Sequence, residues 1–161
     1  MSQFKPLPPL EELKEAFAYD PDTGLFTHKT SRPSIRKGEI AGHVGNNGYC
    51  RISFKRERFL AHRWAWLFLT GNDPADLQVD HIDRVRNHNW ISNLRLTTQG
   101  PNRANSISKG WTKKGSRFRA QIRIADKVTF LGSYKTSEEA SAVFQQRHIE
   151  EYGDFSPYLT Q

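Results

Sequence analysis

The sequence predicts an α+β fold made of two small domains, residues 1–106 and 107–161. Residues 78–106 have the pattern of a strand, a loop, a second strand and a helix, which is a ββα unit. Residues 118–153 have the pattern of two strands followed by a capped helix. With 161 residues, 36% of them hydrophobic, the chain has enough apolar side chains for modest cores.

Short elements are expected upstream of the ββα unit, because apolar residues there recur at helical or strand spacing between turn residues. They are a helix with Leu10, Leu13 and Phe17 that ends before Asp20, a strand at 25–27, strands at 40–44 and 49–54 joined by a turn at 45–48, and a buried helix at 64–69 that stops at Gly71. The last helix is too short to span a bilayer.

Charge is distributed unevenly along the chain, whose formal net charge is +7. Residues 31–67 and 101–135 are basic, and they flank a nearly neutral stretch at 68–100. This distribution predicts a polyanionic partner, most simply nucleic acid, contacted on both sides of a central site. Scattered, solvated basic residues are the alternative.

Cys50 is the single cysteine of the chain, so a disulfide within the chain and a structural zinc site of several thiolates are both excluded. The alternating pattern around Cys50 favours a buried small side chain. No apolar run approaches the length of a membrane span, and the first residues lack a hydrophobic signal region. We therefore expect a cytoplasmic protein, in a bacterial host if the gene is a phage gene.

Asp80 and His81 are adjacent, Asn93 directly precedes the second strand of the ββα unit, and Asn102 lies in its helix. A carboxylate and an amide oxygen suit a hard divalent cation, and an imidazole can take a proton from water near neutral pH. Neighbouring strand residues point to opposite faces, so Asp80 and His81 can converge only at a strand end or a bulge. A core histidine beside a capping aspartate is the alternative.

The motifs VDHID, NLRLTT and QGPNRAN, in this order, resemble the HNH nuclease family in its phage and intron homing-endonuclease branch. The preceding segments YDPDTGLFTHK, AGHVGNNGYCRISF and FLAHRWAWLFLTG resemble the region upstream of the HNH centre, so the resemblance covers most of residues 10–106. It implies a ββα-metal core at about 78–106 and cleavage of phosphodiester bonds to 5′-phosphate and 3′-hydroxyl products.

The HNH resemblance also implies residue roles. Asp80 and Asn102 match the ligands of one Mg²⁺ or Mn²⁺ per active site, and His81 matches the general base. Structural roles in the motif are implied for Asn93, Asn89 and Asp83, whereas the role of His88 is open because relatives usually have Asn or Asp there. No structural zinc is expected.

The segment after residue 117 alternates strictly in polarity. One face of the expected strand carries Phe118, Ala120, Ile122 and Ile124, and the other carries Arg117, Arg119, Gln121 and Arg123. A capping box at 136–139 opens a helix whose apolar residues Ala140, Val143, Phe144 and Tyr152 can cover the first face before the helix ends at Gly153. The second face is left bare, which suits a DNA major groove, although a solvated sheet face is the alternative.

The segments KGWTKKGSRFRAQIRI, FLGSYKTSEEASAVF and YGDFS, within residues 107–155, resemble the plant ethylene-response-factor (apetala-type) DNA-binding domain, which also occurs fused to HNH nucleases. This resemblance implies a three-stranded antiparallel sheet packed on one helix. Thr112 and Phe130 stand where Arg and Trp are usual, so the plant target sequence does not transfer. Expected DNA contacts over the whole chain are Lys109, Lys113, Lys114, Arg117, Arg119, Gln121, Arg123, Arg51, Lys55, Arg56 and Arg63.

Together these features predict a sequence-guided, metal-dependent DNA endonuclease, a homing-type enzyme that nicks or cleaves, with His81, Asp80 and Asn102 as catalytic residues. The alternative is a DNA-binding regulator that keeps the HNH fold without catalysis. An RNA-binding protein ranks last, because paired exposed aromatic residues for base stacking are missing from the pattern. A monomer is favoured, and the target sequence is open.

Overall fold

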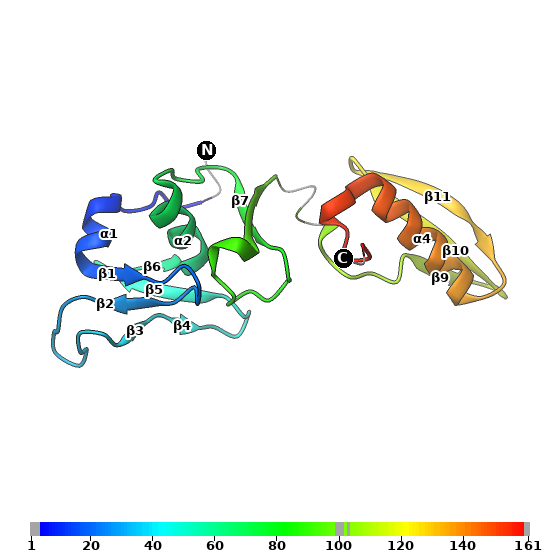
Figure 1. The fold of residues 1–161 in the computed structure, drawn as a ribbon. Helices are drawn as coiled ribbons and strands as arrows, with labels where there is room; N and C mark the ends of the chain where they lie inside the picture. The colour runs from blue at the N-terminus through cyan, green and yellow to red at the C-terminus, as the bar shows by residue number, and fades with distance from the viewer. Residues whose placement is uncertain (1–3, 99–101, 103, 160–161) are drawn as a thin grey trace. The chain divides into compact units, whose positions relative to one another are not determined.

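The computed structural model describes residues 4–98, 102 and 104–159, which form two compact units, residues 1–97 and 98–161 (Figure 1). Both units combine antiparallel sheets with helices, so the α+β prediction is confirmed at this level. The predicted domain boundary after residue 106 stays a prediction. The helix expected after Thr98 runs through residues 99–101 and 103, which lie outside the described residues.

The first unit contains three small antiparallel sheets, in the strand orders β1-β2-β3, β4-β5-β6 and β7-β8. Its elements are α1 (Leu10–Ala16), β1 (Phe17–Tyr19), β2 (Phe26–His28), β3 (Ile40–Ala41), β4 (His43–Val44), β5 (Cys50–Phe54), β6 (Glu57–Leu60), α2 (Ala61–Thr70), β7 (Gln78–His81), the 3₁₀ turn η1 (Ile91–Asn93) and β8 (Leu94–Thr97).

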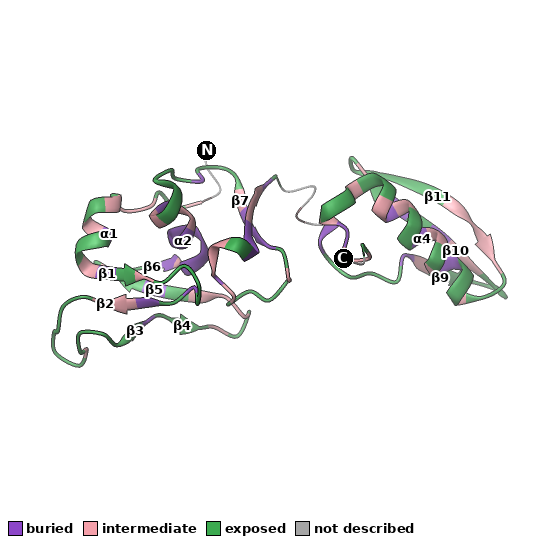
Figure 2. Ribbon diagram, viewed as in Figure 1, coloured by how far each residue is buried: buried purple, intermediate pink, exposed green. Residues whose placement is uncertain are grey.

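Helix α2 forms the centre of the core of the first unit (Figure 2). Trp64 is fully buried and its ring contacts those of Phe17, Phe26 and Phe59. The predicted buried helix and its stop at Gly71 are confirmed, because Gly71 has a φ of 73° and ends the helix. Trp66 on the same helix is only partly buried, so one of the two tryptophans is the core anchor.

Two upstream predictions were wrong in detail. The first helix ends at Ala16, and Phe17 enters strand β1 so that its ring is buried against α2. The strand expected at 40–44 is broken at Gly42, whose φ is 109°. The chain bends at this φ, so β3 joins β2 whereas β4 joins β5. A Cβ at Gly42 would lie 2.8 Å from Cys50 Sγ, so the bend has room only for glycine.

The turn before β2 packs against the loop that follows β7. Gly24 has a φ of 72°, and a Cβ there would lie 2.3 Å from the Trp90 nitrogen and 2.4 Å from the Asn89 carbonyl carbon. The Tyr19 hydroxyl donates to the Asn89 carbonyl at 2.8 Å, and the Ile91 N–H donates to the Pro21 carbonyl at 3.3 Å. The segment 19–24 therefore fixes the backbone at Asn89.

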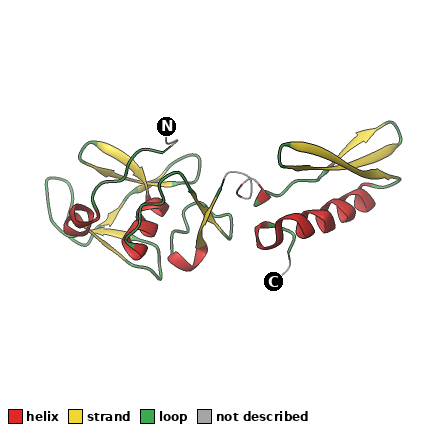
Figure 3. Ribbon diagram, turned by 90° about the horizontal axis from the view of Figure 1, so that it is seen from above, coloured by secondary structure: helices red, strands yellow, loops and turns green. Residues whose placement is uncertain are grey.

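The second unit has one antiparallel sheet, in the order β11-β10-β9, with helix α4 packed on one side (Figure 3). Its elements are β9 (Trp111–Lys114), β10 (Arg117–Ile124), β11 (Lys127–Tyr134), α4 (Ser137–Tyr152) and the 3₁₀ turn η2 (Gly153–Phe155). The predicted capping box is confirmed, because the Thr136 hydroxyl accepts from the Glu139 N–H and the Glu139 carboxylate accepts from the Thr136 N–H.

The predicted alternation of β10 is also confirmed, since Ala120 and Ile122 are buried whereas Gln121 and Arg123 are exposed. The pairing of β10 with β11 shifts between Ala120 and Gln121, where β11 carries one extra residue. Ala120 pairs with Gly132, and the next residue, Gln121, pairs with Phe130.

We predict that Gly24→Ala lowers the free energy of unfolding by about 2–4 kcal/mol, because the new Cβ would overlap the Asn89–Trp90 backbone and require an unfavourable positive φ. Urea unfolding measures this change. Gly38→Ala is the matched control, since Gly38 has a φ of 85° but nothing lies within 4 Å of an added Cβ. A loss equal to the control's, about 1 kcal/mol, would contradict the packing role of Gly24.

Candidate active site

The β7–β8 ladder places the Asp-His pair at the end of a strand. Asp80 pairs with Arg95 across the ladder, and His81, the last residue of β7, pairs with Leu94. The chain turns directly afterwards, where the Ile82 N–H donates to the Asn93 carbonyl at 2.8 Å. Asp80 and His81 are both buried, at 8% and 4% exposure. The strand end is the position that convergence of adjacent residues requires.

Asp80 is held by a buried ion pair. Arg95 Nε donates to Asp80 Oδ2 at 3.0 Å, and Arg95 Nη2 lies 2.9 Å from the same oxygen. The side chains are 17% and 9% exposed, so solvent screens this attraction only weakly. The ion pair fixes the carboxylate beside the His81 backbone.

His81 is held by Asn89, whose Oδ1 lies 3.1 Å from Nε2 of the imidazole. An amide oxygen only accepts hydrogen bonds, so in the neutral ring the proton is on Nε2 and the basic nitrogen is Nδ1. Burial lowers the pKa of His81, although the Asn89 bond and the charge of Asp80 act in the opposite direction. Near pH 7 the ring is therefore neutral and able to accept a proton.

Asn93 joins the two ends of the loop between β7 and β8. Its Oδ1 accepts from the Asp83 N–H at 3.0 Å, and its Nδ2 donates to Asp83 Oδ1 and to the His88 carbonyl, both at 2.9 Å. Asp83 Oδ2 also contacts His88 Nδ1 at 2.6 Å. Burial alone would raise the pKa of Asp83, but its hydrogen bonds with His88, Val85 and Asn93 together lower it. These bonds give His88 a partner within the loop.

His62 contacts the site but has no signal in the sequence pattern. It lies on α2 at 5% exposure, and its ring centroid is 5.0 Å from that of His81, edge to face. Burial lowers the pKa of His62 to about 3, with smaller effects from His81 and Arg63. The ring of Tyr49 lies against both imidazoles, at 5.3 Å from His62 and 6.1 Å from His81. These contacts arise between segments far apart in the chain.

Arg63 corrects one of the predicted DNA contacts. It is 3% exposed and donates through Nη1 to the Leu77 carbonyl at 2.9 Å and through Nη2 to the Ala75 carbonyl at 2.8 Å. A guanidinium used in this way ties α2 to the segment before β7 and cannot reach a phosphate. Its place inside an apolar helical run was the available signal.

The other predicted DNA contacts of the first unit are exposed. Arg51 lies on β5, and Lys55 and Arg56 lie in the turn between β5 and β6. Lys55 Nζ pairs with Glu12 at 2.6 Å, so part of its charge is already neutralised.

In the second unit, the register sorts the predicted contacts between the two sides of the sheet, because directly paired residues share a face. Lys114 pairs with Arg117 on the open side, away from α4, whereas Lys113 pairs with Phe118 on the helix side, where Nζ lies 5.7 Å from the ring. Lys109 stacks on Trp111, at 4.8 Å. Lys113 therefore does not belong to the open face on which the other predicted strand contacts lie, which are Arg117, Arg119, Gln121 and Arg123.

Asn102 is helical and partly buried, and it belongs to the second unit. Its backbone N–H donates to the Thr98 carbonyl at 3.3 Å. The meeting of Asn102 with Asp80 and His81 stays a prediction. Across residues 4–98, 102 and 104–159, no group of three or more His, Cys, Asp or Glu side chains is arranged to hold a metal ion.

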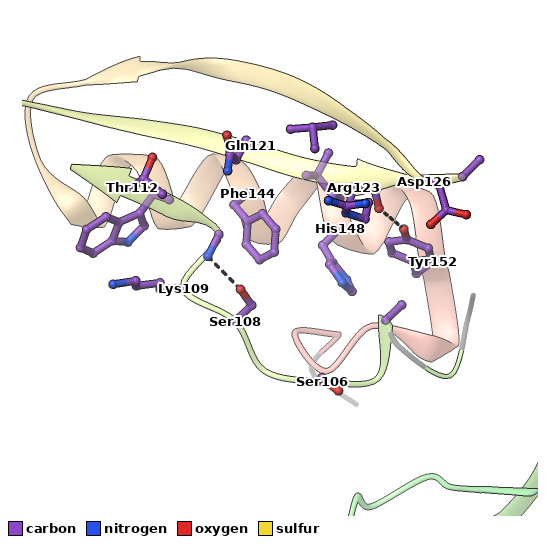
Figure 4. A pocket seen from close by; sticks show the side chains of 16 residues that line it. Ser106, Ser108, Lys109, Thr112, Gln121, Arg123, Asp126, Phe144, His148 and Tyr152 are labelled. Carbon is purple, nitrogen blue, oxygen red and sulfur yellow. Dashed lines mark hydrogen bonds between the residues drawn. The ribbon is translucent and has the colours of Figure 1, made fainter. Parts of the chain in front are cut away.

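The second unit contains a cavity of about 580 Å³ along the edge of β10 (Figure 4). It is lined by Phe144 and His148 from α4, together with the segment before β9. Two hydrogen bonds join residues that line the cavity. The Tyr152 hydroxyl donates to the Arg123 carbonyl at 2.6 Å, and the Gly110 N–H donates to Ser108 Oγ at 3.2 Å. His148 Nδ1 also contacts Ser156 Oγ at 2.9 Å, which anchors the C-terminal segment.

Two comparisons with known proteins give HNH endonucleases as matches. Residues 59–104 match the family model described as HNH endonuclease. The protein is 30% identical over 122 residues to a protein named uncharacterized HNH endonuclease L560 from Acanthamoeba polyphaga mimivirus. This alignment covers 71% of the chain and 64% of the viral protein, which is just under two thirds of that relative. No solved structure matches significantly.

The described residues include no helix that is long and apolar enough to cross a membrane.

We predict that the first unit loses stability as the pH falls, because His62 stays neutral in the folded state whereas the unfolded chain binds a proton below its ordinary pKa of 6.5. With a folded pKa of about 3, His62 accounts for roughly 2 kcal/mol of lost unfolding free energy between pH 7 and pH 5. Urea unfolding at both pH values measures the change.

His62→Phe should reduce this pH dependence, whereas His43→Phe, at an exposed position on β4, should leave it unchanged. An equal pH dependence in His62→Phe and the unsubstituted protein would contradict burial of a neutral His62.

Proposed function

We propose that the HNH domain hydrolyses phosphodiester bonds of double-stranded DNA with a divalent cation, His81 being the general base. The observation that supports this most directly is the state of His81, a buried imidazole whose Nε2 is held by Asn89 so that Nδ1 is the basic nitrogen. A general base needs a neutral and oriented ring, and His81 has both properties beside the Asp80 carboxylate.

In the proposed reaction, His81 Nδ1 takes a proton from a water molecule, and the water oxygen attacks the phosphorus. The bond from phosphorus to the 3′-oxygen breaks, and that oxygen takes a proton from solvent. The products are a 5′-phosphate and a 3′-hydroxyl. General base catalysis of this kind contributes about 10²–10⁴-fold to the rate.

Asp80 and Asn102 are the residues that would hold the cation. Their oxygen donors fit Mg²⁺ or Mn²⁺, because these ions are usually bound by one or two carboxylates and complete their coordination with water and substrate phosphate. Bound there, the ion would neutralise charge on the phosphate and on the departing 3′-oxygen. Arg95 orients the Asp80 carboxylate in either case.

The second unit would supply DNA binding through the open face of its sheet. The support is the arrangement of β10, which exposes Gln121 and Arg123 on the side away from α4. Arginine and glutamine are the side chains that pair with guanine and adenine edges in the major groove. A homing-type role is proposed, in which each active centre nicks one strand.

A DNA-binding regulator without catalysis is the second candidate. The observation in its favour is the Asp80–Arg95 ion pair, because a carboxylate whose charge is already compensated attracts a cation less strongly. A metal-dependent plasmid-nicking assay distinguishes the two functions.

We predict that His81→Ala lowers nicking of supercoiled plasmid at least about 10²-fold while duplex binding stays unchanged, because the base is lost and the DNA-contact surface is not. His43→Ala is the matched control, since His43 is exposed on β4 and should retain activity. Undiminished nicking by His81→Ala would reject the assignment of the base.

We predict that chelation of divalent metal abolishes nicking, that Mg²⁺ restores it, and that Asp80→Asn raises the Mg²⁺ concentration needed for half-maximal rate by at least about tenfold, because one charged ligand is lost. A titration of initial rate against Mg²⁺ measures this. Asp76→Asn, at an exposed acid of the same unit, should leave the titration unchanged. A rate that is independent of metal would exclude the proposed cation.

A further inference from the structure

Two large apolar side chains are exposed on the open face of the second unit. Val128 is 56% exposed and Phe130 is 53% exposed, and both lie on β11. They pair with Arg123 and Gln121 on β10, so they share the face of these polar residues. Exposure of these apolar side chains to water is unfavourable, and they do not pack against α4. Exposed apolar side chains within a basic strand face are typical of a surface that contacts a ligand.

Arg119 stacks on Phe130. Its guanidinium carbon lies 5.0 Å from the centre of the ring, a distance within the range of cation–π contacts. The contact places the guanidinium over the face of the ring. Within the described residues, no hydrogen bond or ion pair engages the Arg119 side chain. Arg119 is therefore positioned by an apolar partner, with its donors available.

Arg117 on the same face is used differently. Its Nε donates to Ser133 Oγ at 3.3 Å and its Nη2 donates to the Ser133 carbonyl at 2.6 Å. These bonds tie β10 to β11 and occupy the guanidinium edge that base recognition would need. Of these two arginines, Arg119 is the one presented to a ligand.

Base edges in the major groove match this pair of side chains. A guanidinium edge can bind the O6 and N7 acceptors of guanine, and an apolar ring can contact the C5-methyl group of thymine. Because Arg119 and Phe130 are in contact, the two bases that they recognise must also be neighbours. Cytosine in place of thymine would present no methyl group to Phe130.

We propose that Arg119 and Phe130 together recognise a guanine next to a pyrimidine that carries a 5-methyl group, thymine in unmodified DNA. This inference rests on the proposed DNA binding by the second unit and adds its base preference. Charge favours DNA as the occupant over a second copy of the chain, since the face that surrounds Phe130 carries Lys114, Arg117, Arg119 and Arg123, which would repel their own copies.

The test uses the full chain without divalent metal, at one fixed salt concentration, because DNA affinity depends strongly on salt. A duplex is first selected from a pool with a randomised central sequence, and its dissociation constant is measured by fluorescence anisotropy. The same duplex is then made with every thymine replaced by uracil, which keeps base pairing and removes the methyl groups. A further version carries 7-deazaguanine, which removes the N7 acceptor.

We expect uracil substitution to weaken binding about fourfold for each methyl group that Phe130 covers. Phe130→Ala should bind the thymine and uracil duplexes equally, whereas Ile107→Ala, at a 72% exposed position outside the strands, should keep the full difference. Arg119→Lys keeps the charge but loses the guanidinium fork, so it should become insensitive to 7-deazaguanine. Phe130 is exposed and Arg119 is partly exposed, so neither substitution removes a core side chain, and circular dichroism checks that the variants fold.

Three results would overturn the proposal. Equal binding of the thymine and uracil duplexes by the unsubstituted protein would remove the methyl contact while leaving DNA binding in place. A difference that persists in Phe130→Ala would assign the methyl contact to another residue. Self-association that depends on Phe130, measured by sedimentation, would assign the face to a second copy. Absence of any duplex binding would instead reject the proposed function of the second unit.

Discussion

The orientation of His81 depends on the position of Asn89, and Asn89 is fixed from outside its own loop. Its side chain holds the imidazole, and its backbone is held by the Tyr19 hydroxyl and by close approach of Gly24. Asn93 secures the same loop from the other end through Asp83 and the His88 carbonyl. With Cys50 as its single cysteine, the chain braces this loop by packing and amide hydrogen bonds instead of a multi-thiolate metal site.

Burial sets the chemistry at this loop. His62 and His81 face one another in an environment that disfavours a charged imidazole, and Tyr49 covers both rings. Burial of the neutral rings lowers the free energy of unfolding in acid, because the unfolded chain takes up protons that the folded chain excludes. The gain is a ring that is neutral near pH 7 and held in one tautomer by an amide oxygen. Stability and reactivity are thus linked through the same desolvation.

Local patterns in the sequence predicted the elements better than their contacts. The buried helix around Trp64, its stop at Gly71, the alternation of β10 and the capping box at Thr136 each follow from spacing within a few residues, and each was confirmed. The break at Gly42 was missed because the crowding there comes from Cys50, which is distant in the pattern. The proposed metal-binding roles of Asp80 and Asn102 stay predictions, since they require these two side chains to lie close enough to bind one cation.

Contacts between segments explain the remaining errors in the same way. Arg63 counted as one more basic residue in a basic stretch, yet its donors bind the Ala75 and Leu77 carbonyls. Lys113 was grouped with its neighbours, but a strand places it on the side of α4. No local spacing in the sequence indicates the contact of His62 with His81, because the two rings approach one another only when α2 packs beside β7. The strand register and the tertiary packing determine which partner or face each of these side chains has.

The extra residue that β11 accommodates opposite Ala120 and Gln121 decides which aromatic surface the second unit displays. In an uninterrupted ladder, Leu131 would stand opposite Gln121 and Phe130 would turn inward beside Ile122. Loss of the codon for Thr129, with the ladder closed up, would therefore place the Leu131 isobutyl group where the Phe130 ring now stands. A one-residue insertion or deletion can therefore change which side chain the open face presents to a ligand in a single step, whereas a point substitution changes only the side chain at its own position.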